Sequence, residues 1–147
     1  MFCFQCQEAA KNEGCTIKGM CGKENTTANL QDLLVFNLKG IAVIAQKSKA
    51  AGVAVPNSAA AFIGKGLFTT ITNANFDDEN LVAWINRAQA LKKELAAAAG
   101  DKLGGDLHES ATWYSNDVAS FAAKAETVGV LSTENEDVRS LRELLIL

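Results

Sequence analysis

The sequence predicts an all-α protein, and three observations lead to that prediction. The 147-residue chain is 48% hydrophobic and has a single proline, so long helices are rarely interrupted. Apolar residues recur at helical spacing in several successive segments. Glycine-containing or polar stretches separate these segments. We therefore expect a three-helix bundle of ordinary domain size, preceded by a cysteine-rich N-terminal loop.

The first predicted helix follows capping side chains at Thr26, Thr27 and Asn29. It is expected to end near Gly52, before Pro56. Its apolar positions at helical spacing are Leu30, Leu33, Leu34, Leu38, Ile41 and Ala45. Further apolar residues lie on its other faces, which indicates a helix buried on several sides.

The second predicted helix begins at a cap formed by Asn57 or Ser58. Gly64 and Gly66 lower its helix propensity by about 1 kcal/mol each relative to Ala, and they would allow a close approach to a neighbouring helix. Its expected inner residues are Phe62, Ile63, Gly66, Leu67, Thr70 and Ile71.

The third predicted helix opens at Asp77, where Asp78 and Glu79 complement the helix dipole, and it ends at Gly100. Its expected inner residues are Leu81, Trp84, Ile85, Ala88, Leu91 and Leu95.

Two shorter helices complete the prediction, after a polar connection over residues 100–113. One covers residues 116–126, stops before Gly129, and has four expected inner residues: Val118, Phe121, Ala122 and Ala125. The other follows a capping box over residues 133–136, with apolar positions at Val138, Leu141, Leu144 and Leu145.

The predicted organisation is a cysteine-rich loop over residues 1–27, a helical bundle over 28–135 and the start of a further helix over 136–147. Residues 144–147 are four successive aliphatic residues with no capping residue after them. Because fraying would expose these side chains, we expect the natural polypeptide to continue and this last helix to be truncated.

The cysteines are concentrated in one short segment. Cys3, Cys6, Cys15 and Cys21 lie within the first 21 residues, and the remaining 126 positions contain none. Four thiolates on one loop can surround one metal centre, and nearby glycines allow the backbone to fold around it. Phe2, Phe4, Ile17 and Met20 could shield such a centre from water. Lys11, Lys18 and Lys23 could offset its negative charge.

Three kinds of site fit four clustered cysteines. An iron–sulfur cluster suits the irregular Cys-x2-Cys-x8-Cys-x5-Cys spacing. A structural zinc ion would use the same thiolates, although zinc sites usually pair two closely spaced knuckles. A disulfide pair or a thiol redox motif is the third kind, and it is disfavoured because the N-terminus shows no secretory signal, which predicts a cytoplasmic, reducing location.

Charge and hydropathy exclude other classes of function. The net charge is −3 and no Lys/Arg block occurs, so a nucleic-acid binder is not expected. No uninterrupted apolar run reaches about 18 residues, so no membrane span is expected. The lone histidine, His108, lies in a polar stretch beside Glu109 and is expected to be solvent-exposed.

Four segments resemble the hybrid cluster proteins, also called prismane proteins or hydroxylamine reductases. They are residues 1–15 (MFCFQCQEAAKNEGC), 26–40 (which includes ANLQDLL at 28–34), 66–78 (GLFTTITNANFDD) and 134–145 (ENEDVRSLRELL). Together these segments extend over nearly the whole chain, so the chain is identified from its sequence as similar to this family.

The resemblance implies a helical N-terminal domain with a cubane cluster near its start. It implies that Cys3, Cys6, Cys15 and Cys21 are the four ligands of a [4Fe–4S] cluster. It also implies a parent enzyme that reduces hydroxylamine to ammonia, with nitric oxide reduction or peroxide protection as further proposed roles. The expected partners are the remaining domains of that enzyme and a redox donor protein.

The chain departs from the family pattern after residue 21. Family members reduce their substrate at a second, hybrid iron–sulfur–oxygen cluster, whose ligands lie in later domains. No cysteine follows Cys21, and His108 matches no ligand motif. The hybrid cluster is therefore not expected in this chain, which is expected to carry electrons without turning over substrate alone.

Overall fold

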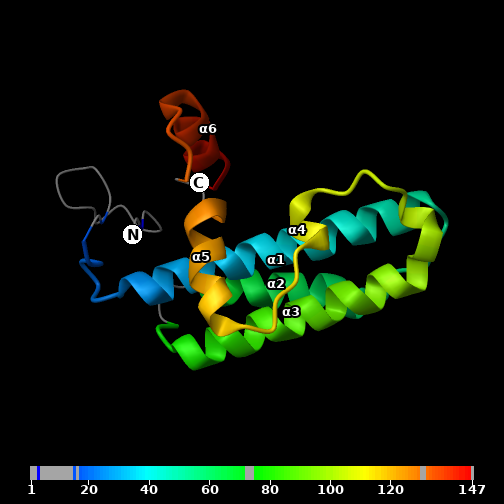
Figure 1. Ribbon diagram of the computed structural model, residues 1–147, viewed down its shortest axis with the longest axis horizontal. Coiled ribbons are helices and arrows are strands. Elements are labelled where there is room, and N and C mark those ends of the chain that lie inside the picture. The colour runs from blue at the N-terminus through cyan, green and yellow to red at the C-terminus, as the bar shows by residue number, and fades with distance from the viewer. Residues whose placement is uncertain (1–2, 4–14, 16, 72–74, 130–131, 147) are drawn as a thin grey trace.

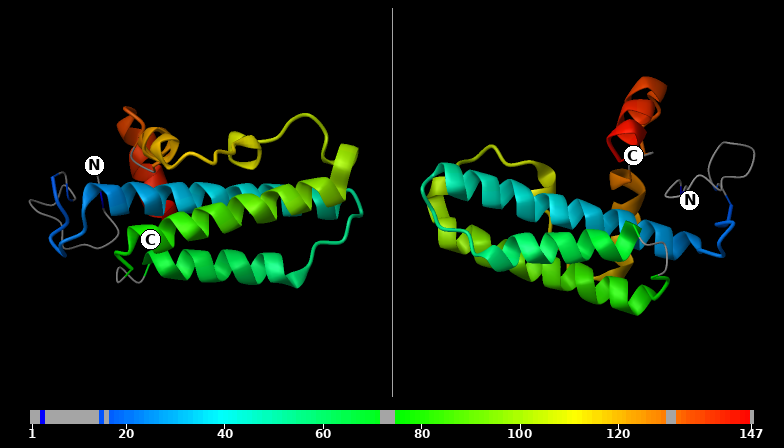
Figure 2. Two further views of the ribbon diagram at one scale, coloured as in Figure 1. Left: turned by 60° about the horizontal axis from the view of Figure 1, so that its bottom comes forward. Right: turned by 180° about the vertical axis from the view of Figure 1, so that it is seen from behind.

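The computed structural model describes Cys3, Cys15 and residues 17–71, 75–129 and 132–146, and the fold is all-α as predicted (Figure 1). The elements are α1 (Asn25–Ala50), α2 (Asn57–Ile71), α3 (Asp78–Ala99), the 3-10 turn η2 (Gly100–Leu103), α4 (Glu109–Thr112), α5 (Val118–Val128) and α6 (Glu136–Ile146). Helices α1, α2 and α3 lie side by side as the expected bundle (Figures 1 and 2).

Helix α1 is the central element. It contacts α2, α3, α4 and α5. Its most deeply buried apolar residues, each at most 2% exposed, are Leu33, Leu34, Leu38, Ile41 and Ile44. By length and composition α1 is apolar enough to cross a membrane, although polar residues interrupt its apolar stretch and no such span was predicted from the sequence. A central bundle helix has the same composition, and just over half of this apolar stretch is buried against the other helices.

The start of α1 differs from the prediction, whereas its end agrees. The helix already begins at Asn25, and Glu24 precedes it without a side-chain cap. The Thr27 hydroxyl is used elsewhere, since it donates to Asp78 Oδ1 of α3 at 2.6 Å. At the other end Gly52 has φ +72°, which glycine adopts without strain.

Helix α2 buries a narrower stripe than predicted. Gly66 and Thr70 are buried, but Leu67 and Ile71 are 38% and 67% exposed. The expected close approach holds for Gly66, where an added Cβ would lie 2.8 Å from Leu38 Cδ1. It is wrong for Gly64, which has no neighbour within 4 Å.

Helix α3 agrees with the prediction at both ends. Asp77 Oδ1 accepts a hydrogen bond from the Asn80 amide at 3.0 Å, and Gly100 follows the last residue of the helix. Of its expected inner residues, Trp84 is half-buried and its ring packs at a tilt against Phe62 of α2, with ring centroids 5.0 Å apart. This contact joins α2 to α3.

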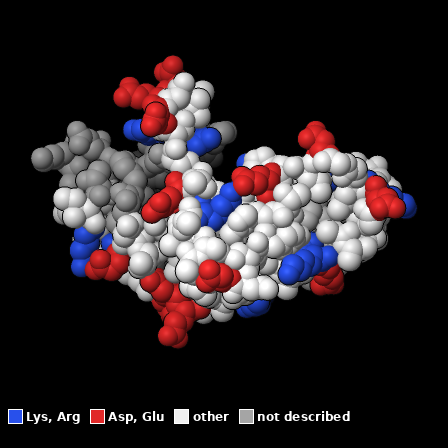
Figure 3. Space-filling view, in the orientation of Figure 1, with Lys and Arg blue, Asp and Glu red and all other residues white. Residues whose placement is uncertain are grey.

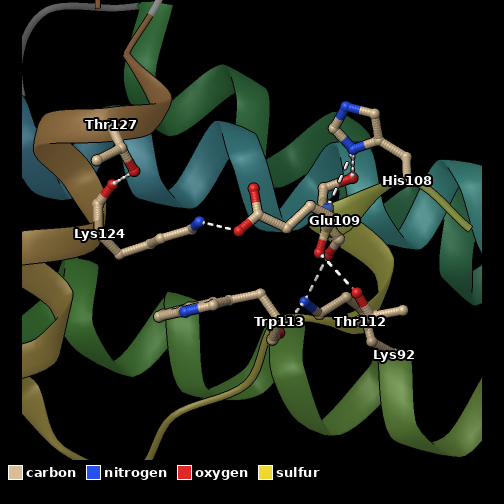
Figure 4. Close-up of polar contacts among 8 residues, drawn as sticks. Lys92, His108, Glu109, Thr112, Trp113, Lys124 and Thr127 are labelled. Atoms are coloured by element: carbon tan, nitrogen blue, oxygen red, sulfur yellow. Dashed lines mark hydrogen bonds and ion pairs between the residues drawn. The ribbon is translucent and has the colours of Figure 1, made fainter.

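The segment expected to be a polar connection is mostly exposed, but it contains η2 and α4, and its residues Leu103, Ser110 and Ala111 are buried against the bundle. Ser110 of α4 is fully buried, and its carbonyl accepts a hydrogen bond from Lys92 Nζ at 2.8 Å. The same ammonium group donates to the Trp113 carbonyl at 2.8 Å (Figure 4). Burial lowers the pKa of Lys92 to about 8, so these two carbonyls are needed to hold its charge.

Helix α5 crosses α1 and ends before Gly129 as predicted. Phe121 and Ala125 are buried, but Val118 and Ala122 are exposed, contrary to the prediction. Lys124 pairs with Glu109 of α4, which ties α5 to the preceding segment (Figure 4).

Helix α6 projects away from the bundle (Figure 1). Its cap is Asn135, whose Oδ1 accepts from the Val138 amide at 3.0 Å, rather than the predicted Thr133. Leu141 is 61% exposed, and the side chains of Leu144 and Leu145 lie outside the described part of the chain.

Candidate metal centre

Two of the four cysteines are paired through their backbones. The Cys3 amide donates to the Cys15 carbonyl at 3.1 Å, and the Cys15 amide donates to the Cys3 carbonyl at 2.9 Å. Residues that exchange both hydrogen bonds in this antiparallel way have Cα atoms about 5.5 Å apart, with side chains on the same face. Cys3 and Cys15 are therefore brought together although 12 positions separate them in sequence.

A tight turn positions Cys21 just before α1. The Gly22 amide donates to the Gly19 carbonyl at 2.8 Å, and the Gly19 amide donates to the Lys23 carbonyl at 2.9 Å. Gly22 has φ +90°, a conformation that a side chain would strain. Within this turn the Met20 amide points at Cys15 Sγ, 3.5 Å away.

Lys23 reaches from the end of this turn to the cysteine pair. Its Nζ lies 3.7 Å from Cys3 Sγ and 2.9 Å from Gln31 Oε1 of α1. Its side chain is fully buried, which resolves whether this lysine faces the cysteines or the solvent. Lys18, by contrast, pairs with Glu24 at 2.6 Å and its side chain is 57% exposed.

The structure assembles the predicted ligand set only in part. Cys3 and Cys15 are adjacent, Cys21 is exposed on the neighbouring turn, and Cys6 lies outside the residues that the structure describes. No disulfide joins Cys3, Cys15 or Cys21 to one another. Among the described positions, no three His, Cys, Asp or Glu side chains gather as a metal-binding group. The four-cysteine ligand set thus stays a prediction.

The expected apolar shield is not formed by its described members. Ile17 is 89% exposed and Met20 is 69% exposed, so neither covers the cysteine pair. Phe2, Phe4 and Lys11 fall outside the described ranges. Among the described residues, Phe76 does lie beside this site, with its ring centroid 5.6 Å from Lys23 Nζ.

The surroundings of Cys3 and Cys15 suit an anionic sulfur-ligated centre. A backbone amide donates to one sulfur and a buried ammonium group donates to the other. Donors of this kind stabilise thiolates and the sulfur atoms of iron–sulfur clusters. The residues present therefore fit either an iron–sulfur cluster or a thiolate-bound metal ion.

Two polar residues beside this site were missed by the sequence prediction, because α1 appeared mainly apolar. Gln31 is almost fully buried and fixes Lys23. Asp32 is half-buried against Gly129, and burial raises its pKa to about 7, while the nearby charge of Lys23 opposes the rise. The sequence does contain a sign of these two residues, because both are polar and interrupt the apolar stretch between Leu30 and Leu33.

His108 is exposed, as predicted, and has a structural contact. Its Nδ1 accepts from the Ser110 amide at 3.0 Å and so caps α4. Its Nε2 lies 3.0 Å from Lys39 Nζ. On the face drawn in Figure 3, basic and acidic side chains of the described residues are interspersed, with no continuous basic area.

Comparison with known proteins decides the family. The model of the prismane/CO dehydrogenase family matches residues 1–147, the entire chain. The chain belongs to this family. The identification made from the four sequence segments is confirmed.

Relatives of the chain carry the name hydroxylamine reductase. The protein of that name from Halothermothrix orenii is 54% identical over 99% of this chain and 27% of its own length. Those from Desulfitobacterium hafniense and Nitratidesulfovibrio vulgaris are each 53% identical, over 27% and 28% of their lengths. The chain thus spans about a quarter of the curated relatives that it matches.

Proposed function

We propose that this chain is the N-terminal electron-transfer segment of a hydroxylamine reductase, and that Cys3, Cys6, Cys15 and Cys21 bind a [4Fe–4S] cluster. The observation that carries the proposal is the reciprocal hydrogen bonding of Cys3 and Cys15, in a chain that matches the family along its whole length. A bound cluster would supply a one-electron redox centre.

The residues of the chain have definable tasks in this proposal. The cysteine thiolates would ligate iron, and the backbone bridge holds Cys3 and Cys15 at a separation that one centre can span. The Met20 amide would stabilise negative charge on Cys15 Sγ by donating to it. Helix α1 begins directly after the turn and anchors it to the bundle.

The complete enzyme would use such electrons to reduce hydroxylamine. Two electrons and two protons convert hydroxylamine to ammonia and water, with cleavage of the N–O bond. Nitric oxide reduction and peroxide protection are further candidate roles of the parent protein. Because no cysteine follows Cys21, we propose that this chain stores or relays electrons and needs the other domains for turnover. A redox donor protein and a cytoplasmic location belong to the same proposal.

Metal analysis of anaerobically prepared protein tests the assignment. We expect iron and acid-labile sulfide in near-equal amounts, with a visible charge-transfer band that Cys15→Ser abolishes. Lys18→Met, which changes an exposed residue of the same loop, should retain both. Zinc without sulfide would instead establish a structural metal site and a helical structural or binding module. Hydroxylamine turnover comparable to that of a full-length reductase would contradict the dependence on other domains.

A further inference from the structure

We propose that Lys23 sets the reduction potential of the cysteine-bound centre by holding a buried positive charge against the Cys3 sulfur. The inference rests on the proposed function, since it requires a redox centre at these cysteines. It assigns a specific electrostatic task to a residue that supplies no ligand.

The ammonium group of Lys23 is held on two sides. Its Nζ donates to Gln31 Oε1 at 2.9 Å and lies 3.7 Å from Cys3 Sγ. The amide of Gln31 is itself oriented, because its Nε2 donates to the Asn75 carbonyl at 3.1 Å. The side chains of Lys23 and Gln31 are 0% and 1% exposed. The charge is therefore fixed in position instead of being distributed over many lysine conformations.

Because Lys23 is buried, its charge acts more strongly on the cysteine sulfur than the charge of Lys18, the other described lysine of the loop, would. Lys18 differs by only five positions, but its ammonium is solvated and paired with Glu24. Charge interactions weaken severalfold when water and counterions screen them. Lys23 and Lys18 thus carry the same charge in the same segment with very different screening, which gives a matched comparison.

The direction of the effect follows from the charge of the centre. Four thiolates around an iron–sulfur core give a net negative charge, and reduction adds one more electron. A fixed positive charge stabilises the reduced state more than the oxidised state, so it raises the reduction potential. Removing that charge should lower the potential and leave the ligands unchanged.

The decisive variants are Lys23→Met, Lys23→Arg and Lys18→Met in the 147-residue chain with its cluster reconstituted anaerobically. Each potential is measured by redox titration, followed by visible absorption and electron paramagnetic resonance, at matched iron and sulfide content. All titrations use one pH, because Asp32 titrates near neutrality and interacts with Lys23.

We expect Lys23→Met to shift the equilibrium between the reduced and oxidised states at least tenfold toward the oxidised state. This shift lowers the reduction potential by about 59 mV for a one-electron couple. Lys23→Arg should retain most of the parent potential, and Lys18→Met should remain close to it. A loaded Lys23→Met variant with the parent potential would overturn the inference, as would an equal fall for Lys18→Met.

A second variant decides the case if Lys23→Met does not fold or load. Gln31→Glu keeps the size of the side chain and leaves Lys23 in place, but it adds a negative charge beside the ammonium group. Its potential should also fall, and an unchanged value would refute the electrostatic role. If the parent chain takes up no iron and sulfide, the proposed function fails and this inference fails with it. A normal cluster whose potential ignores both variants sinks the Lys23 inference alone.

Discussion

Gly40 of α1 lies close to the backbone of α4, and replacing it with alanine should destabilise the protein. A Cβ added to Gly40 would lie 2.1 Å from the Ser110 carbonyl oxygen and 2.8 Å from Lys92 Cδ. Ordinary contacts of this kind begin at 3.4 Å. The α4 backbone must therefore retreat by roughly 1 Å in a core that is already close-packed.

The expected loss of stability for Gly40→Ala follows from three effects. Overpacking of a core costs about 1–3 kcal/mol. Displacing the Ser110 carbonyl weakens its hydrogen bond to the buried Lys92 ammonium, which adds about 1.5–3 kcal/mol. The higher helix propensity of alanine returns about 1 kcal/mol. We expect a net loss of about 3 kcal/mol for Gly40→Ala, or roughly 10 °C in Tm for a chain of this size.

Gly64→Ala is the matched control, because it makes the same change in a helix where nothing lies within 4 Å. It should raise stability by about 0.5–1 kcal/mol through helix propensity alone. Urea unfolding of both metal-free variants under reducing conditions, followed by far-UV circular dichroism, measures the difference. If Gly40→Ala proves as stable as Gly64→Ala, the close approach of α1 and α4 described above is wrong.

Two further predictions concern α5 and α1. Phe121 is 1% exposed and its ring centroid lies 6.0 Å from that of Trp113. Phe121→Ala should therefore lower the free energy of unfolding by about 3–5 kcal/mol and alter tryptophan fluorescence. Val118→Ala, on the exposed face of the same helix, should change the free energy of unfolding by no more than about 0.5 kcal/mol. Equal losses of stability in the two variants would refute the assigned orientation of α5. Burial raises the pKa of Asp32 from 3.8 to about 7, so between these values the native state holds a proton that the unfolded chain has released. Stability should therefore fall as pH rises through that window, and Asp32→Asn should flatten the dependence in urea titrations at several pH values. Identical pH profiles for the parent and Asp32→Asn would contradict this.

Much of the fold was predictable because local signals and tertiary packing agree. The cap at Asp77, the stops at Gly52, Gly100 and Gly129, and the apolar positions of α1 all depend on residues within a few positions. Packing between segments that are distant in sequence was harder to predict. Residues 100–113 look polar in sequence, yet they pack on α1 because Gly40 leaves room and Lys92 binds two of their carbonyls.

The candidate site shows the same division. Clustering of the cysteines is visible in the sequence, whereas the pairing of Cys3 with Cys15 depends on the path of the backbone. Composition did not distinguish Lys23 from Lys18, because both are lysines in the same loop. Their difference arises from Gln31 in α1, which accepts a hydrogen bond from Lys23 Nζ and is itself oriented by the Asn75 carbonyl.

The junction between the cysteine turn and α1 has a thermodynamic consequence. The turn ends at Lys23, two residues before the helix that contacts most of the other elements, and Lys23 is bonded to both. A ligand that binds only the folded turn stabilises everything that folds with it, by an amount that grows with ligand concentration over Kd. Ligand occupancy at the cysteine turn and unfolding of the helices packed on α1 would then belong to one linked equilibrium, in which removing a bound metal destabilises those helices.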